Sequence, residues 1–506
     1  MRIVTTALNA HLEWPAERPP GLDPALLPAF LFPSGSEAMR SRLADPQTLL
    51  VTTGQQPGLF TGPLYTIHKA LSAAALAREL EQRWDRPVQP VFWIAGDDHD
   101  FAEANHIAWP SPDGGVSNVI LRQRNAEAPL TPMYREPLGP EIEAALSRMI
   151  QELTGGEFKD DVEAWLRRHY TATASVAESF AGALAELLAP YGIICFRSTH
   201  RAAKRATARH IVRALGLATD LDRDLAHRAR ELAASGQDPG VAAGDQATLV
   251  MLEGIAGRDR LVIDGDGFVT RRSGERFTLD QLQTIAADAP ERLSGNVLLR
   301  PVLESAILPT VAYIAGPGEL RYLALTTPVY DRMRVHRQMP LARWSGILVE
   351  PRVDRTLSRY DADLDELLNP GALETRVVRT QLPADTLSAF EEMRAAISRG
   401  YDRIQPLALQ VDPTLQRPVE SARRHALSEN GDLEKRITQH LKRRHEVEFA
   451  QVARARTAVL PGGKPQERVY GIAPYLARYG PGTLDEVFAA VAEWYSATLV
   501  GQPLPS

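Results

Sequence analysis

Ionisable side chains are concentrated in a short segment that directly follows the apolar run 88–95. Residues 96–106 contain three aspartates, one glutamate and two histidines, namely Asp97, Asp98, His99, Asp100, Glu103 and His106. Side chains of these types can bind Mg²⁺ or Zn²⁺, hold a substrate amine or transfer a proton, provided that several of them converge. Successive side chains diverge along the backbone, so at most two or three of them can share one site.

A helix start is the alternative explanation, in which Asp97 or Asp98 caps the helix and the others lie near the positive end of its dipole. Capping needs one carboxylate, and this segment carries several. We therefore favour a functional role, with Asp98, His99 and Asp100 as candidate catalytic groups and with Gly96 and Asp97 in binding. His99 or an aspartate could act as a general base if burial or a neighbouring charge shifts its pKa suitably.

A second candidate segment is a turn rich in glycine and glutamine, which follows the apolar run 49–51. Such a turn before a helix can cradle a phosphate or a carboxylate, and glutamines at a strand end can bind polar substrate groups. The turn fits neither the P-loop pattern nor GxGxxG, so no P-loop is predicted. The alternative is an ordinary turn followed by a solvated helix face. The candidates are Gly54, Gln55, Gln56, Thr61, Gly62, Tyr65 and Lys69 for binding, and His68 for catalysis.

Two further segments carry candidate binding residues. Arg300 could clamp a carboxylate or a phosphate, and Glu319, which follows Gly316 and Gly318, could cap a helix or bind substrate. The alternative is a strand–turn–helix junction with Arg300 on the surface. Lys464 is a candidate in a Gly-rich loop, where a solvated loop is the usual explanation. Lysine is rare in this Arg-rich chain, which has only Lys69, Lys159, Lys204, Lys435, Lys442 and Lys464.

The candidate segments follow predicted strands. The apolar runs 49–51, 88–95 and 308–315 read as buried strands, and each ends shortly before a glycine. A strand, a Gly-rich turn, a helix from residue 64 to about residue 84 and another strand are typical of a βαβ unit. Ligands bind beyond the carboxyl ends of the strands in an open parallel sheet. We therefore predict an α/β fold with a parallel sheet and a site at these strand ends.

The length of 506 residues favours two or three structural units. We predict a core over residues 1–378 with insertions near 110–188 and 255–295, a helical domain over 379–460, and a C-terminal segment, 461–506, that returns to the core.

Apolar residues recur at helical spacing over 385–404 and 415–452, which is typical of an antiparallel helical hairpin or a short coiled coil. The alternative is an ordinary helix pair packed on the core, because Gly400, Pro406 and Gly431 interrupt the heptads.

Composition excludes several classes of protein. Lys and Arg total 57 against 63 Asp and Glu, a net charge of −6 that argues against a general nucleic-acid binder. No apolar run reaches the length of a membrane span, and the first residues do not resemble a secretory signal, so we expect a soluble cytoplasmic protein. The single cysteine, Cys195, excludes an intramolecular disulfide, a Cys-rich zinc site and an iron–sulfur cluster. It lies in an apolar strand and is expected to be structural.

Several blocks of the chain resemble the bacillithiol biosynthesis cysteine-adding enzyme family. They are residues 53–69, 91–101, 296–301, 308–319, 328–330 and 463–468, and they occur in the family order over nearly the whole chain. The resemblance implies a Rossmann-like core related to class I aminoacyl-tRNA synthetases and nucleotidyltransferases, with connecting insertions. It also implies a helical coiled-coil domain, often the dimer contact.

The reaction implied by the resemblance joins the carboxyl group of L-cysteine to the amine of glucosaminyl-malate in the last step of bacillithiol synthesis. Amide formation from a free carboxylate needs activation, so ATP is the expected co-substrate, with Mg²⁺ accompanying it. The HIGH and KMSKS motifs of the synthetases are not evident, so the ATP step cannot be mapped by motif. We expect small-molecule substrates, a homodimer and no resident metal site.

Two alternatives remain open at the level of sequence. A metal-dependent hydrolase could use Asp97, Asp98, His99 and His106 as ligands and base. A nucleotide-binding scaffold protein could recruit a partner through the helical region.

Overall fold

The structure is a computed structural model, and it describes residues 1–6, 19, 21–33, 36–154, 156–383 and 385–499. The chain divides into two compact units, Ile3–Leu348 with Lys464–Ser506, and Val349–Gly463 with Met1–Arg2. The predicted domain boundaries at residues 378 and 460 stay predictions. Residues 500–506, the end of the predicted C-terminal segment, lie outside the described residues.

A six-stranded sheet forms the centre of the first unit, in the order β14-β13-β3-β4-β7-β2. Its neighbours from β14 to β7 are all parallel, and only β2 at the edge is antiparallel. The central strands β3, β4 and β13 are buried along almost their whole length, as expected when both faces of a parallel sheet are covered. Their bounds are β2 (Phe30–Leu31), β3 (Leu49–Gln55), β4 (Val88–Ile94), β7 (Ile194–Arg197), β13 (Thr310–Ala315) and β14 (Met339–Ala342).

The order of the parallel strands is that of a doubly wound Rossmann-like sheet. The chain runs from β3 outward through β4 to β7, then returns to the other side of β3 with β13 and β14. The direction of winding therefore reverses between β3 and β13. Such a switch point opens a crevice at the carboxyl ends of the two strands. The α/β, Rossmann-like fold class predicted from the sequence is confirmed.

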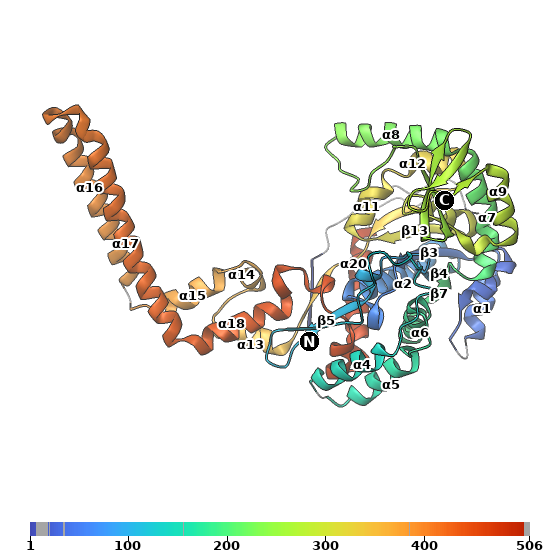
Figure 1. Cartoon of the computed structure of the whole chain (residues 1–506). Helices are drawn as coiled ribbons and strands as arrows, with labels where there is room; N and C mark the ends of the chain where they lie inside the picture. The colour runs from blue at the N-terminus through green and yellow to red at the C-terminus, as the bar shows by residue number, and fades with distance from the viewer. Residues whose placement is uncertain (7–18, 20, 34–35, 155, 384, 500–506) are drawn as a thin grey trace. The chain divides into compact units, whose positions relative to one another are not determined.

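Helix α2 (Leu64–Trp84) connects β3 to β4 and is buried over most of its length. It starts after Pro63 and ends at Asp85, whose left-handed backbone (φ 48°) stops the helix. One side packs against β3 and β4, and another packs against α20 (Gly482–Leu499), as Figure 1 shows. Small residues such as Ala73, Ala74 and Ala77 permit this close packing, since they are almost fully buried.

The predicted insertion near 255–295 belongs to a second sheet, in the order β11-β10-β9-β8-β12. This sheet is antiparallel throughout. Its strands are β8 (Ala247–Gly254), β9 (Gly257–Asp264), β10 (Gly267–Thr270), β11 (Arg276–Phe277) and β12 (Leu293–Gly295). Helices α7 (Arg201–Gly216), α8 (Ala218–Ala234) and α9 (Leu279–Asp288) share an apolar core with it.

The predicted insertion near 110–188 consists of a two-stranded antiparallel sheet and three helices. The strands are β5 (His106–Pro110) and β6 (Val116–Ile120), and the helices are α4 (Glu141–Glu152), α5 (Lys159–His169) and α6 (Val176–Leu188). The remaining elements of the first unit are β1 (Arg2–Thr5), α1 (Glu37–Ala44), α3 (Phe101–Ala104), α10 (Arg300–Ile307), α11 (Pro317–Leu323), α12 (Thr327–Met333), β15 (Gly346–Val349) and α19 (Ala473–Tyr479).

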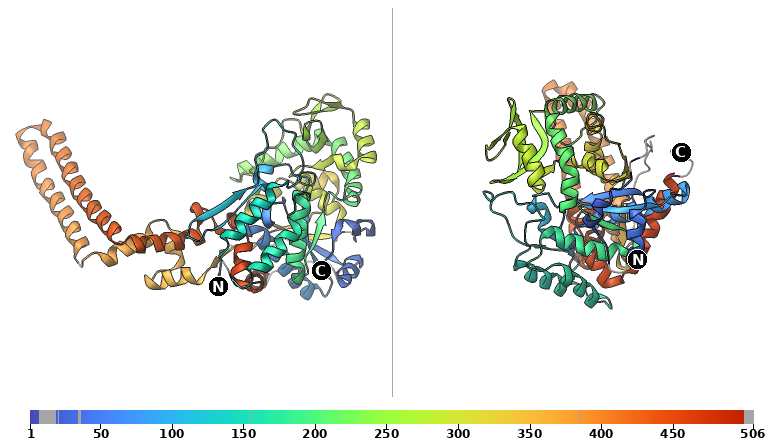
Figure 2. Two further views of the ribbon diagram at one scale, coloured as in Figure 1. Left: turned by 60° about the horizontal axis from the view of Figure 1, so that its bottom comes forward. Right: turned by 90° about the vertical axis from the view of Figure 1, so that its right-hand side faces the viewer.

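The second unit is helical and contains a long antiparallel hairpin of α16 (Thr386–Val411) and α17 (Gln416–Arg444). The two helices lie side by side in Figure 1 and in the left view of Figure 2. Ion pairs between Arg394 and Glu434 (2.6 Å) and between Arg423 and Asp402 (2.9 Å) cross the hairpin in antiparallel register. The helices run through Gly400, Pro406 and Gly431 without ending. The unit also contains α13 (Pro351–Arg359), α14 (Leu364–Leu368), α15 (Ala372–Gln381) and α18 (Glu446–Val459).

The coiled-coil part of the predicted fold is thus confirmed. Among the helices that the structure describes, none offers a stretch long and apolar enough to cross a membrane.

Candidate functional site

A cavity of about 620 Å³ lies at the carboxyl ends of β3, β4 and β13. The turns after these three strands line it together with α2, α7 and the second sheet. Because β3 and β13 flank the switch point of the central sheet, this is the place where an open α/β sheet is expected to bind ligands. Its volume suits small-molecule substrates.

Most of the residues predicted from the sequence lie around this cavity. Those that line it are Gly54, Gln55, Gln56, Tyr65, Lys69, Asp97, Asp98, His99, Asp100, Arg300, Gly316, Gly318 and Glu319. Five predicted residues do not line it, namely Thr61, Gly62, His68, Gly96 and Lys464. The catalytic and binding roles themselves stay predictions.

Lys69 is the buried cation at the switch point, and only 1% of its surface is exposed. Its Nζ donates to the backbone oxygen of Gly54, lies 3.2 Å from Gln55 Oε1 and pairs with Glu319 Oε2 at 2.6 Å. Burial lowers the pKa of Lys69, although the carboxylate of Glu319 opposes this shift. The alternative that placed His68 and Lys69 on a solvated helix face is wrong, because α20 and the sheet bury α2 on both sides.

Glu319 joins the two sides of the switch point. Its Oε2 also accepts the backbone N–H of Gly316 at 2.7 Å, and its Oε1 accepts the hydroxyl of Tyr313 at 2.7 Å. Burial by itself raises the pKa of Glu319, but Lys69 and Arg300 outweigh it, and the pKa falls below its usual value. Glu319 therefore caps α11 as a carboxylate and also lines the cavity, whereas substrate binding by this residue stays a prediction.

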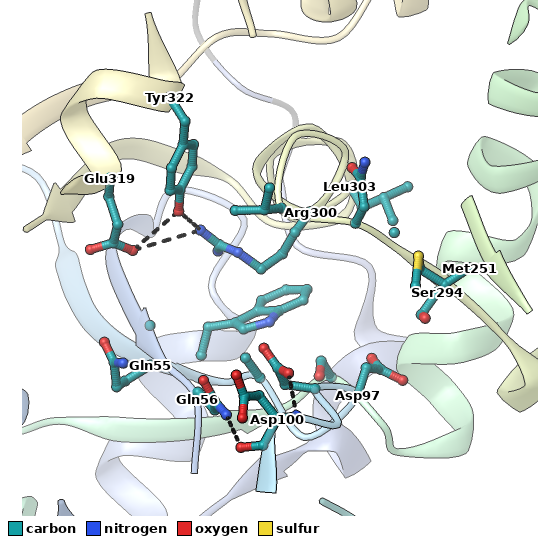
Figure 3. A pocket seen from close by; sticks show the side chains of 18 of the residues that line it. Gln55, Gln56, Asp97, Asp100, Met251, Ser294, Arg300, Leu303, Glu319 and Tyr322 are labelled. Carbon is teal, nitrogen blue, oxygen red and sulfur yellow. Dashed lines mark hydrogen bonds and ion pairs between the residues drawn. The ribbon is translucent and has the colours of Figure 1, made fainter. Parts of the chain in front are cut away.

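Arg300 is partly buried at the first position of α10, so the alternative that placed it on the surface is wrong. Its guanidinium lies 2.9 Å from Glu304 Oε2 and 3.0 Å from the hydroxyl of Tyr313. Arg300, Glu319 and Tyr322 point toward one another at one end of the cavity (Figure 3). Much of the donor capacity of Arg300 is thus used inside the protein.

Glu304 lies fully buried behind this group. Burial raises its pKa to about 7, although Arg300 and the hydroxyl of Thr52 favour the charged form.

The acidic loop after β4 combines a helix start with pocket-lining side chains. Asp100 Oδ1 caps α3 by accepting the N–H of Glu103, and Asp98 Oδ1 accepts the N–H groups of His99 and Asp100. A helix therefore does start at this loop, but its cap is Asp100 and not Asp97 or Asp98, which the helix-start alternative named. Gln56 fastens the loop to the turn after β3, since its Nε2 donates to the backbone oxygen of Asp100 at 2.8 Å (Figure 3).

Asp97 and His99 face cations that the sequence prediction missed. Asp97 Oδ1 lies 2.5 Å from Nζ of Lys204, a buried lysine on α7. His99 Nδ1 lies 3.2 Å from a guanidinium nitrogen of Arg258 on β9. Within the described ranges, no three His, Cys, Asp or Glu side chains are arranged to hold a metal ion. Asp97 and His99 each contact a cation, Lys204 or Arg258, and this does not favour a metal ion between them.

His68 lies beside the cavity and acts on it indirectly. Its Nδ1 lies 2.9 Å from Glu467 Oε2, and its ring packs edge-on against Trp344. Glu467 in turn pairs with both terminal nitrogens of Arg343, which lines the cavity. Burial opposes the charged form of Glu467, yet His68 and Arg343 lower its pKa to about 2. His68 thus helps to position Arg343.

The other predicted residues outside the lining have structural surroundings. Thr61 is fully buried, and its backbone N–H donates to the hydroxyl of Tyr170 at 2.7 Å. Gly62 has a positive φ of 69° in the same turn. Gly96 is buried, and a β-carbon on it would lie 3.2 Å from the methyl carbon of Thr199. Lys464 is exposed.

Five cations around the cavity escaped the sequence prediction, namely Lys204, Arg258, Arg260, Arg343 and Arg468. Two of them carried a signal: Lys204 is one of six lysines, and Arg468 follows Lys464 by four residues in the same family-like block. The others are arginines in an Arg-rich chain, and nothing local distinguishes them.

The lining contains seven Lys or Arg side chains and five Asp or Glu side chains, although the whole chain has a net charge of −6. Arg260 and Arg468 form no ion pair with any acidic residue that the structure describes. The cavity therefore offers fixed carboxylates for an ammonium group and uncompensated cations for carboxylate or phosphate groups.

Two family models match the chain: bacillithiol biosynthesis BshC, N-terminal Rossmann-like domain, over residues 34–343, and its C-terminal coiled-coil domain over residues 346–494. A relative in Koribacter versatilis is 32% identical over 443 residues, which cover 87% of this chain and 81% of the relative. A relative in Chlorobaculum tepidum is 30% identical, covering 91% of this chain and 84% of its own length. A third, in Prosthecochloris aestuarii, is 29% identical, covering 88% and 81%. All three are named as candidate cysteine ligases BshC.

Proposed function

Because this chain belongs to the BshC family of bacillithiol biosynthesis and is a cysteine ligase, we propose that it joins L-cysteine to glucosaminyl-malate in the last step of the synthesis. The new bond is an amide between the carboxyl group of cysteine and the amine of the sugar.

A free carboxylate is a poor electrophile, so we propose that ATP activates it. An acyl-adenylate would form with release of pyrophosphate, or an acyl-phosphate with release of ADP. The amine then attacks the acyl carbon, loses a proton and expels AMP or phosphate. A group with mixed charges, as the cavity lining provides, suits both the cysteine zwitterion and a polyanionic co-substrate.

The observation that carries this proposal is the meeting of the turns after β3, β4 and β13 in one cavity at the switch point. The acidic loop offers Asp98 and Asp100 toward the cysteine ammonium, and these residues are also the candidates for accepting the amine proton. Lys69, held by Glu319, is the buried cation for charge that develops at the leaving group. Arg468, with no acidic partner among the described residues, is the free cation for a phosphate. Mg²⁺ would be carried mainly by phosphate oxygens and water, as is usual for this ion.

The test incubates the purified full-length chain with cysteine, glucosaminyl-malate and Mg·ATP, and omits one component at a time. Mass spectrometry follows the cysteinyl product, and phosphorus NMR distinguishes AMP with pyrophosphate from ADP with phosphate. Product that forms only in the complete mixture supports the proposal. Turnover without ATP that a chelator abolishes would support the hydrolase instead, and nucleotide binding without turnover would support the scaffold.

The homodimer remains a proposal that rests on the family resemblance, and the cytoplasmic location remains one that rests on the sequence. Light scattering on the intact chain and on a chain lacking residues 386–444, the α16–α17 hairpin, tests the first of them.

A further inference from the structure

His99 and Arg258 lie next to each other in the lining of the cavity. A guanidinium nitrogen of Arg258 lies 3.2 Å from His99 Nδ1. An arginine side chain has only donors and stays protonated in proteins, so it cannot accept a hydrogen bond. In this contact, therefore, Nδ1 of His99 must be the acceptor. A neutral imidazole whose Nδ1 accepts carries its proton on Nε2.

The positions of both residues are fixed by other contacts. The Nε of Arg258 donates to Ser294 Oγ at 2.9 Å, and another guanidinium nitrogen donates to the backbone oxygen of Gly295 at 2.8 Å. The backbone of Arg258 donates to Leu130 at 2.9 Å. The preceding Gly257 (φ 77°) lies so close to Leu130 that a β-carbon would come within 2.4 Å of its backbone nitrogen.

His99 is held on its own side in the same way. Its backbone N–H donates to Asp98 Oδ1 at 2.6 Å, and its backbone oxygen accepts from the guanidinium of Arg124 at 2.9 Å. These contacts hold the backbone of His99, and its imidazole cannot exchange its tautomer without losing the contact with Arg258.

The charged groups around His99 keep it neutral on balance. Burial and the guanidinium of Arg258 lower the pKa of His99, and Arg124 acts in the same direction. Asp98 and Asp100 on its own loop oppose the shift without cancelling it. Because the pKa of His99 lies below its usual range, the imidazole is uncharged at neutral pH, in agreement with the acceptor role of Nδ1.

The cavity lining near Arg258 is cationic, since it includes Arg260 and Lys204. Arg260 has no acidic partner among the residues that the structure describes, and Lys204 is paired with Asp97. An N–H donor in such surroundings suits an anionic oxygen.

We propose that Arg258 is a positioning residue that locks His99 as the neutral Nε2–H tautomer, so that His99 donates a hydrogen bond to an anionic oxygen of a substrate and does not serve as the base for the amine. This inference rests on the proposed function only for the identity of the substrate. The prediction that His99 is a candidate general base is thereby replaced by a donor role, and the aspartates of the loop remain candidates for the base.

The first test is spectroscopic and needs no turnover, so its outcome is separate from that of the ligase assay. The full-length chain is prepared with ring-¹⁵N-labelled histidine, and the signals of His99 are assigned by comparison with His99→Gln. We expect protonated Nε2 and unprotonated Nδ1 from pH 7 to pH 9. A proton on Nδ1, or an imidazolium at pH 7, would overturn the proposal.

The second test identifies the anionic oxygen. L-malate, Mg·ATP and glucosamine are added separately to the labelled chain. A shift of the His99 Nε2–H signal with malate assigns the donor to a substrate carboxylate, and a shift with Mg·ATP alone assigns it to a phosphate. Glucosamine, which has neither group, is expected to leave the signal unchanged. The donor role is refuted if neither anion moves the signal.

The third test separates positioning from a purely structural role. Arg258→Met removes the donor to Nδ1, whereas Arg258→Lys keeps a charged donor. In Arg258→Met we expect the pKa of His99 to rise, although burial still lowers it, and both neutral tautomers to be present. Affinity for the anion is expected to fall by about tenfold or more. Arg258→Lys is expected to restore the Nε2–H state. Unchanged His99 signals in Arg258→Met with intact folding would contradict the proposed lock.

Discussion

Replacing Glu319 by glutamine tests how the switch point tolerates the buried charge of Lys69. The substitution keeps the shape of the side chain but removes the carboxylate that lies 2.6 Å from Nζ of Lys69. Removing one partner of a buried ion pair costs about 3–5 kcal/mol. Lys69 keeps its contacts with Gly54 and Gln55. We therefore expect the lower end of that range, about 3 kcal/mol of lost unfolding free energy.

The complementary variant Lys69→Met is expected to cost less, about 2 kcal/mol. In this variant Glu319 keeps the N–H of Gly316 and the hydroxyl of Tyr313, and Arg300 remains 4.0 Å away. The double variant leaves neither charge unpaired, so its cost is expected to fall short of the sum of the single costs by at least about 1 kcal/mol.

The pH dependence supplies a further check of the same prediction. Without Glu319 the pKa of Lys69 falls further below its usual value, because burial then acts unopposed. The unfolded chain then binds more protons than the folded chain at alkaline pH. The stability of Glu319→Gln is therefore expected to rise with pH until the ordinary lysine pKa of about 10.4, whereas the Lys69→Met variant lacks this contribution.

Urea unfolding at pH 7 and pH 9, followed by tryptophan fluorescence, measures these differences. All seven tryptophans lie outside residues 349–463, so the signal reports the unit that contains the cavity. The reasoning would be refuted if Glu319→Gln were as stable as Lys69→Met, or if the two costs were additive.

Three other outcomes follow from the same structure. Arg468→Gln is expected to raise the KM for ATP about tenfold and to change the KM for cysteine little. The reason is that Arg468 lines the cavity and has no acidic partner among the described residues. Steady-state kinetics measure both constants, and Arg276→Gln, at an exposed position, is the matched control. The pKa of Glu304 is raised to about 7, so the folded chain binds more protons there than the unfolded chain, and stability falls as pH rises from about 4.5 to about 7. Glu304→Gln should remove about 3 kcal/mol of this fall in unfolding free energy. An unchanged dependence of stability on pH would show that Glu304 is not neutral in the folded state. Burial raises the pKa of the Cys195 thiol to about 12, so an aromatic disulfide reagent should not react with it in the native chain and should react once in urea; rapid labelling of native protein would contradict its burial.

The sequence alone supports the α/β class, because strand-forming runs, glycine turns and a helix follow one another locally. It also places the site at the strand ends, since parallel strands bring their carboxyl ends to one edge whatever the order of the strands. Helical spacing over 385–404 and 415–452 is also visible in the sequence, and the hairpin tolerates Pro406 and the two glycines within its helices. The second sheet was predicted only as an insertion near 255–295, because antiparallel pairing depends on contacts between segments.

The functions of individual side chains depend on the tertiary structure. Lys69 meets Glu319 across 250 residues, Lys204 meets Asp97 across 107, and Arg258 meets His99 across 159. Local propensity and spacing carry no information about pairs that are so far apart in the sequence. The order of the strands decides that β13 lies beside β3, and this alone brings Glu319 to Lys69.

Burial separates residues that look equivalent in the sequence. His68 and Lys69 are adjacent on α2, yet one is held against Glu467 and the other faces the cavity. Lys464 and Arg468 share one short block, and only Arg468 lines the cavity. The sequence therefore determined which turns form the site, whereas the packing of α2 and the return of residues 464–499 decided which side chains enter it. The physical reason is that a charge acts according to its partners and its distance from water, and both are set by the whole fold.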